Sequence, residues 1–224
     1  MSAQGFTRRL LAWYGRSARD LPWRRTRDPY RVLVSEVMLQ QTQVSRVSEF
    51  YPRFLERFPT LEHLARAQPR AVREAWDGLG YYARATNLHA LARSVVRRYD
   101  ATLPEEPEEL MKLPGVGPYT AGAVASFAYE KPVPAVDTNV ARVIRRVFFG
   151  NRKAASTRRA TWDERRRTWQ LAAALVPKNG KKAWKFNQAI MELGALICVA
   201  RKPKCGECPV RPVCRTGTAR RTGA

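Results

Sequence analysis

The sequence lacks a signal peptide, a lipidation signal and any apolar run long enough to cross a membrane. These absences argue against a membrane protein and predict a protein of the reducing cytoplasm, where disulfides are rare. No segment alternates polar and apolar residues for long, so β-strands are not expected. Acidic residues are scarce, with 19 Asp and Glu against 41 Lys and Arg, which gives a net charge of +22. An excess this large predicts a polyanionic partner, with nucleic acid as the first candidate.

What the chain does contain is a helical pattern along almost its whole length. Five segments carry apolar residues three and four positions apart: 6–14, 47–58, 88–99, 169–176 and 189–197. Proline and glycine recur between them at helix-length intervals. The sequence therefore predicts an all-α fold with short connections. The polar, basic tail 215–224 is expected to be disordered.

Every cysteine lies in one short segment near the C-terminus. The spacing is Cys198-x6-Cys205-x2-Cys208-x5-Cys214. Four thiolates this close together can bind a [4Fe–4S] cluster or a zinc ion. Only one CxxC pair is present and the flanking spacings are unequal, which favours iron–sulfur without excluding zinc.

A glycine-rich turn predicts a contact to phosphate. Residues 113–123 read Leu-Pro-Gly-Val-Gly-Pro-Tyr-Thr-Ala-Gly-Ala, between a short apolar helix and a longer one. Gly115 and Gly117 allow a tight turn, and the positive end of the next helix favours an anion. In so basic a chain we interpret the segment of about 108–128 as a helix–hairpin–helix that grips a DNA phosphate.

Two carboxylates stand out from their surroundings. Glu36 lies within the apolar segment 32–39, so it must be paired, or desolvated with a raised pKa, as a general acid requires. A structural ion pair with an arginine is the equal alternative. Asp137 is expected to cap a helix N-terminus, to keep a low pKa there and to remain charged.

Seven motifs together resemble the endonuclease III superfamily, and within it the adenine DNA glycosylases of the MutY type. They are Leu21–Arg24, Ser35–Thr42, Gly78–Ala85, Leu113–Gly117, Asp137–Asn139, Phe186–Gln188 and the four cysteines. The resemblance implies a [4Fe–4S] cluster bound by Cys198, Cys205, Cys208 and Cys214. It also implies a six-helix lobe (26–131) and a cluster lobe made from both termini (1–25 and 132–214), with double-stranded DNA in the cleft between them. We expect a monomer that works at the nucleoid.

The same resemblance assigns roles to individual residues. Glu36 would protonate adenine at N7, Asp137 would stabilise the cationic sugar, Tyr119 would assist at the sugar, and Asn139 would order water and Asp137. The residues that would line the adenine pocket are Trp23, Arg24, Leu39 and Gln188. The residues that would contact DNA are the wedge residues Gln41 and Tyr81 and the hairpin residues Leu113, Gly115, Val116, Gly117 and Thr120. The implied reaction is hydrolysis that removes adenine opposite guanine or 8-oxoguanine.

Two features depart from the family pattern. Thr138 stands where MutY-type enzymes have glycine, and its side chain must fit near Asp137. MutY-type enzymes also usually continue into a C-terminal domain that reads 8-oxoguanine, whereas this sequence ends ten residues after Cys214. We therefore expect a weaker preference for 8-oxoguanine, or one supplied by a partner.

Three alternatives belong to other functional classes. A bifunctional glycosylase/lyase would need an amine nucleophile, and that branch has lysine where this chain has Tyr119. A thymine glycosylase acting on T·G mismatches shares the tyrosine but is not expected to carry the segments 40–42 and 186–188. A protein that only binds nucleic acid would leave Glu36 and Asp137 without a purpose.

Overall fold

The computed structural model describes residues 2–150 and 160–218, and within these ranges the secondary structure is helical, with no strand. The all-α prediction is therefore confirmed. No helix in the described part of the chain is long and apolar enough to cross a membrane. The chain divides into two compact units, which we call unit 1 (1–19 and 130–224) and unit 2 (20–129).

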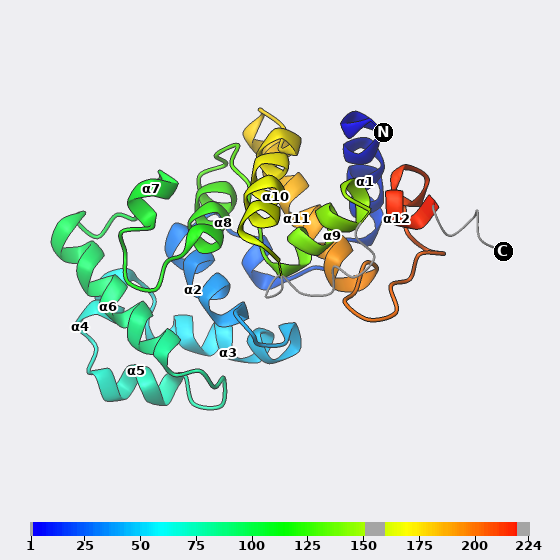
Figure 1. Ribbon diagram of the computed structural model, residues 1–224. Coiled ribbons are helices and arrows are strands. Elements are labelled where there is room, and N and C mark those ends of the chain that lie inside the picture. Colours follow the sequence, from blue (N-terminus) through cyan, green and yellow to red (C-terminus); the bar gives the residue numbers. More distant parts are fainter. Residues whose placement is uncertain (1, 151–159, 219–224) are drawn as a thin grey trace. The chain divides into compact units, whose positions relative to one another are not determined.

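Unit 2 contains a 3-10 helix, η1, and the helices α2 to α8 (Figure 1). Their bounds are η1 Pro22–Arg24, α2 Pro29–Leu39, α3 Val44–Arg57, α4 Leu61–Arg66, α5 Pro69–Ala75, α6 Ala83–Arg98, α7 Pro107–Leu110 and α8 Pro118–Ala128. The apolar helix α2 packs against α3 and α8, and α6 packs against α4 and α5. Because α2 contacts neighbours on several sides, its residues from Val32 to Met38 are all buried.

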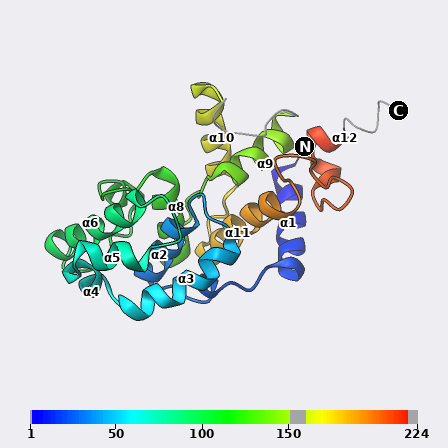
Figure 2. The same ribbon diagram turned by 90° about the horizontal axis from the view of Figure 1, so that it is seen from below.

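Unit 1 combines the first helix with the C-terminal half of the chain. Its helices are α1 Ala3–Ser17, α9 Thr138–Phe148, α10 Trp162–Leu175, α11 Gly180–Leu196, the 3-10 helix η3 Arg211–Val213 and α12 Arg215–Thr218. Figures 1 and 2 show α1 beside α11, and the buried residues Phe6, Leu10 and Tyr14 of α1 join the core formed by α9, α10 and α11. The two ends of the sequence thus share one hydrophobic core.

The boundaries of unit 2, at residues 20 and 129, differ slightly from those predicted for the six-helix lobe, at residues 26 and 131. The segment after Arg19 joins unit 2 because η1 contacts α2 and Trp23 packs edge-on against Tyr51, with ring centroids 5.6 Å apart. At the second boundary, the backbone of Glu130 lies against Gly180 in unit 1. Unit 2 has seven α-helices among its residues rather than the six expected, because α7 is a separate single turn.

The prediction of a disordered tail is wrong at its start. Arg215–Thr218 forms α12, in which Thr216 and Gly217 are buried. The Thr216 hydroxyl donates to the carbonyl oxygen of Arg146 at 2.7 Å, and the Gly217 N–H donates to the Cys214 sulfur at 3.3 Å. These bonds hold the first residues of the tail against the cysteine segment. Residues 219–224 lie outside the described part of the chain.

Candidate active site and metal centre

Glu36 occupies the middle of α2 and is only 3% exposed. Its Oε2 atom accepts a hydrogen bond of 2.5 Å from the Tyr119 hydroxyl, on the first turn of α8. The contact between α2 and α8 brings together residues 83 positions apart in the sequence. The prediction of a buried carboxylate is confirmed, and the Tyr119 phenol is one of its partners.

The turn before Tyr119 has the geometry of a helix–hairpin–helix. Gly115 has a φ of +75°, and a Cβ there would lie 2.7 Å from the Cβ of Asn87, so the position requires glycine. Leu113, Val116 and Thr120 are buried and shape the turn from within. Gly117 caps α8 without a side-chain hydrogen bond to the first turn. The positive end of α8 is therefore not covered by a capping side chain.

Asp137 caps the N-terminus of α9, as predicted, with the Val140 N–H donating to its Oδ1 atom at 2.7 Å. The Asn139 amide donates to Oδ2 at 2.8 Å. The expectation of a low pKa is wrong. Desolvation of the carboxyl raises the pKa of Asp137 above its ordinary value, and the opposing effects of these hydrogen bonds and of the Arg142 charge are smaller. Thr138 is exposed at the first position of α9, so its side chain does not crowd the carboxylate.

Asn139 is itself held in one orientation by Arg142. A guanidinium can only donate, so the 2.7 Å bond from Arg142 to Asn139 Oδ1 turns the Asn139 amide nitrogen toward Asp137. Arg142 also donates to the carbonyl oxygens of Gly194 and Cys198, at 2.8 Å each. A Cβ at Gly194 would stand 2.6 Å from that of Asn139, so glycine is what lets α11 approach α9 here. One hydrogen-bonded chain thus joins Cys198 to Asp137.

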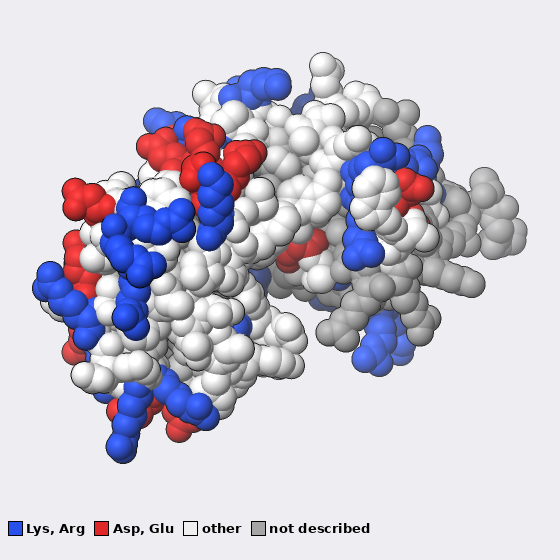
Figure 3. All heavy atoms as spheres, turned by 60° about the vertical axis from the view of Figure 1, so that its left-hand side comes forward, with Lys and Arg blue, Asp and Glu red and all other residues white. Residues whose placement is uncertain are grey.

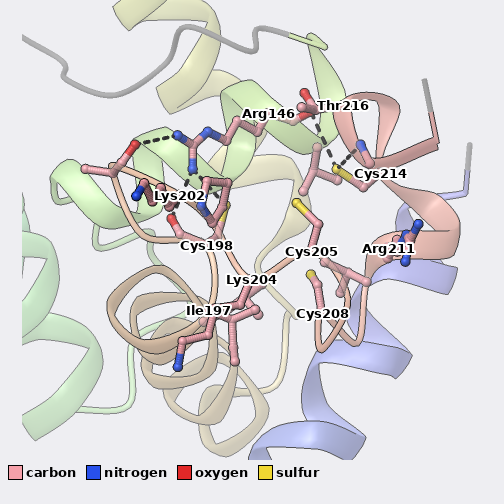
Figure 4. A pocket seen from close by; sticks show the side chains of 16 residues that line it. Arg146, Ile197, Cys198, Lys202, Lys204, Cys205, Cys208, Arg211, Cys214 and Thr216 are labelled. Atoms are coloured by element: carbon pink, nitrogen blue, oxygen red, sulfur yellow. Dashed lines mark hydrogen bonds between the residues drawn. The ribbon is translucent and has the colours of Figure 1, made fainter. Parts of the chain in front are cut away.

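The four cysteines surround a cavity of about 210 Å³ in unit 1 (Figure 4). None of them forms a disulfide. Among the described residues, no three Cys, His, Asp or Glu side chains converge tightly enough to hold a single metal ion. Tetrahedral zinc would need its sulfurs within about 2.3 Å of one point. A cavity ringed by separated thiols fits a polynuclear cluster better than one ion.

The protein around this cavity suits an anionic, cysteine-bound cluster. Arg146 donates to the Cys198 sulfur at 3.5 Å and to the carbonyl oxygen of Val199 at 2.7 Å. Burial raises the pKa of the Cys208 thiol to about 12 and also raises that of Cys214. Thiolates at these positions therefore need a positive centre such as iron to stabilise them.

The remaining predicted residues are divided between the units. Trp23 is buried in unit 2, where Arg24 and Leu39 are partly buried, while Gln188 is 5% exposed in unit 1. Their common pocket remains a prediction. Gln41 and Tyr81 are exposed, and both adopt left-handed backbone conformations, with φ values of 57° and 48°.

Some of the arginines that contribute to the net charge of +22 are buried, which the composition alone does not reveal. Arg84, Arg142, Arg145 and Arg146 are all at most 8% exposed. On the face in Figure 3, basic side chains form separate groups with acidic side chains among them, so this face is not uniformly basic. The sequence of α9 does indicate the burial of its arginines, because they lie between apolar residues. The helix is buried from Val140 to Val147.

A helical unit with a helix–hairpin–helix, together with a unit that holds four cysteines around one cavity, defines a class of helical iron–sulfur proteins. Residues 34–169 match the HhH-GPD superfamily of base excision DNA repair proteins, and residues 198–214 match the iron–sulfur binding domain of endonuclease III. The chain belongs to the HhH-GPD superfamily. Its cofactor is a [4Fe–4S] cluster, which resolves the choice that the cysteine spacing alone left open.

Individual relatives agree with this assignment. The chain is 47% identical over 203 residues to an adenine DNA glycosylase of Mycolicibacterium smegmatis, covering 90% of this chain and 66% of the relative. It is 44% identical to a human adenine DNA glycosylase, covering 92% of this chain and 38% of the relative. A solved thermostable thymine-DNA glycosylase superposes with a TM-score of 0.86 at 32% identity, covering 97% of both chains. The chain thus spans less than two thirds of the length of these adenine glycosylases.

Proposed function

We propose that this chain is a monofunctional DNA glycosylase that removes adenine mispaired with guanine or 8-oxoguanine in double-stranded DNA. The observation that carries the proposal is the hydrogen bond from the Tyr119 hydroxyl to the buried Glu36 carboxyl. A phenol cannot form a Schiff base, so this site suits hydrolysis rather than strand cleavage by a lyase. The similarity to adenine DNA glycosylases of two organisms supports adenine as the target.

In the proposed reaction, protonated Glu36 gives its proton to N7 of adenine. The bond between C1′ and N9 breaks, its electron pair leaves with the base, and the sugar becomes positively charged. Ionised Asp137 stabilises that charge, assisted by Tyr119. Water then adds at C1′ and returns a proton to the Glu36 carboxylate. Asn139, fixed by Arg142, orders the water and holds Asp137.

The protein would act as a monomer at the nucleoid. The other predicted residues would bind the DNA. Trp23, Arg24, Leu39 and Gln188 would line the adenine pocket. Gln41 and Tyr81 would fill the gap that the flipped base leaves in the stack. The hairpin would bind a phosphate through the N–H groups at the start of α8, whose positive end has no capping side chain.

Thymine in T·G mismatches is the second candidate substrate, because a thymine-DNA glycosylase is 32% identical over 97% of the chain. Excision from A·8-oxoG, A·G, T·G and thymine glycol duplexes under single-turnover conditions separates the possibilities. We expect adenine to leave its duplexes fastest. Faster loss of thymine from T·G would replace this proposal with the thymine activity.

Replacing Tyr119 with lysine should add lyase activity. The lysine amine would stand where the phenol now contacts Glu36, within reach of the opened sugar. Borohydride should then trap a covalent protein–DNA adduct that the parent protein does not form. The matched control is Tyr119→Phe, which removes the hydroxyl without adding an amine. Trapping of the parent protein at high yield would contradict the monofunctional assignment.

Cys198, Cys205, Cys208 and Cys214 would be the ligands of the cluster. A preparation made without oxygen should absorb broadly at about 400 nm and contain about four irons per chain. Cys208→Ser should lose this absorbance and lower the melting temperature of unit 1, because ligation contributes folding energy. The chain has no fifth cysteine that could serve as a matched control. Ser45→Ala, at an exposed position in unit 2, is used instead as a neutral substitution. Full iron content in Cys208→Ser would remove Cys208 from the ligand set.

Binding to any duplex should weaken steeply with salt. If six or so phosphates are neutralised, the slope of log K against log salt concentration should be about −5. Titration of an undamaged, fluorescently labelled duplex at several salt concentrations measures this slope. A flat dependence would mean that the charge of +22 serves another purpose.

A further inference from the structure

Two exposed side chains in unit 2 stand on strained backbone. Gln41 follows the C-terminal end of α2, and Tyr81, 61% exposed, precedes α6. Both have positive φ angles, a conformation that non-glycine residues rarely adopt. Such residues persist only where the surrounding structure holds them.

The buried side chain of Arg84, in the first turn of α6, reaches both segments. Its Nη1 atom donates to three carbonyl oxygens at the end of α2, those of Val37 at 3.0 Å, Met38 at 2.7 Å and Gln40 at 2.6 Å. Its Nη2 atom donates to the carbonyl oxygens of Leu79 and Gly80, at 3.1 Å each, and to the hydroxyl of Thr42 at 3.0 Å. One guanidinium therefore ties the residues that flank Gln41 to the residues that precede Tyr81.

The chemistry of these contacts requires arginine. Five of the six acceptors are main-chain carbonyls, and no acidic side chain of the described residues forms an ion pair with Arg84. A cation is favourable there because the carbonyls at the end of α2 lack helical donors. The guanidinium carbon also lies 5.7 Å from the ring centre of Tyr81 and 5.4 Å from that of Trp76. Lysine has one donor centre and cannot span both segments.

Other side chains reinforce the same two segments. Arg46 donates to the carbonyl oxygen of Gly78 at 3.1 Å, and the Trp76 indole N–H donates to that of Gly80 at 3.2 Å. The Gln40 amide donates to the Thr120 hydroxyl on α8 at 3.3 Å. The segment before Tyr81 is thus fixed through its carbonyls, and the segment around Gln41 is fixed to α8. Arg84 alone among these side chains contacts both.

We propose that Arg84 is a positioning residue that locks Gln41 and Tyr81 into one preformed wedge. The two side chains then enter the duplex as a unit, without first having to be ordered at the expense of binding energy. This inference rests on the proposed function, in which these residues fill the space of the flipped base. It adds that the wedge exists before DNA binds and that one buried cation maintains it.

Fluorescence of 2-aminopurine, placed next to the mismatched base, tests the proposal. The measurement uses the 224-residue chain carrying Glu36→Gln, so that insertion is measured without excision. Saturating protein should raise the fluorescence as the stack opens. Arg84→Lys should remove most of this rise, and in the chain with native Glu36 it should slow single-turnover excision on the order of tenfold. Arg93→Lys, an exposed arginine on the same helix, should change neither.

A double-mutant cycle separates positioning from general support of the fold. If Arg84 acts through the wedge, Arg84→Lys should have little further effect on the fluorescence once Tyr81→Ala is present. Additive effects of the two changes, or a lower melting temperature with an unchanged fluorescence rise, would overturn the proposal. If Arg84→Lys does not fold, Thr42→Val decides, because it removes one acceptor and leaves the arginine. A smaller loss of the rise would support the proposal, and no loss would overturn it.

The fluorescence signal does not depend on which base is excised. If the native chain excises no adenine, the proposed function fails. The wedge is still tested by comparing Arg84→Lys with Arg93→Lys on T·G and A·G duplexes. Loss of the signal in Arg84→Lys alone would then support the role of Arg84 independently.

Discussion

Glu36→Gln should abolish base excision while leaving the affinity for mismatched DNA nearly unchanged. The amide has the shape of the carboxyl and can still accept the hydrogen bond from Tyr119, but it has no acidic proton to give to the base. Loss of a general acid costs about 10²- to 10⁴-fold in rate. The measurements are single-turnover excision from an A·G or A·8-oxoG duplex and the dissociation constant for the same duplex.

A second buried glutamate provides the control. Glu192 in α11 is 1% exposed and forms a two-pronged ion pair with Arg19 at 2.8 Å. Glu192→Gln breaks this pair, so it should lower the melting temperature, whereas excision should persist in the folded fraction. If both substitutions slow excision equally and lower stability equally, Glu36 has a structural role and is not the general acid. A structural role was the alternative interpretation of this residue.

The helical periods and the cysteine cluster were predictable because they depend on residues close together in the sequence. The apolar spacing in 6–14 predicted α1, and the glycine-rich segment 113–123 predicted the hairpin. Neither prediction required knowledge of tertiary contacts. The burial of Glu36 also followed from its neighbours, since every residue from Val32 to Met38 is buried. In each case local composition and spacing carry the physical cause.

The roles of the buried arginines could not be predicted in the same way. Arg84 donates to carbonyl oxygens 44 to 47 positions earlier, and Arg142 donates to carbonyl oxygens more than 50 positions later. A main-chain carbonyl exists at every position, so no residue type in the sequence marks such a partner. The prediction of a low pKa for Asp137 was wrong for a related reason. The favourable cap is local and visible in the sequence, but the desolvation that outweighs it comes from tertiary packing.

Asp137→Asn should slow excision by about a hundredfold or more, since a preorganised negative charge is lost. Geometry adds to the loss. The new amide nitrogen would face the Asn139 amide nitrogen, two donors without an acceptor, and Asn139 cannot turn because Arg142 donates to its oxygen at 2.7 Å. The control is Asp28→Asn at the cap of α2, where the Arg31 N–H donates to the aspartate at 2.9 Å. Asparagine caps helices as well as aspartate does, so Asp28→Asn should leave the rate unchanged.

The pH dependence tests the same carboxylate without a substitution. The reaction needs Asp137 ionised, and burial raises its pKa, so the rate should fall with decreasing pH at values above the ordinary aspartate pKa of about 3.9. The sign for stability is opposite. A carboxyl whose pKa is raised by folding stabilises the protein at low pH, and that contribution is lost as the pH rises through the raised pKa. Asp137→Asn should therefore remove both the acidic limb of the rate profile and this pH-dependent part of the melting temperature, whereas Asp28→Asn should keep both. An acidic limb at the same pH in Asp137→Asn would assign it to another group.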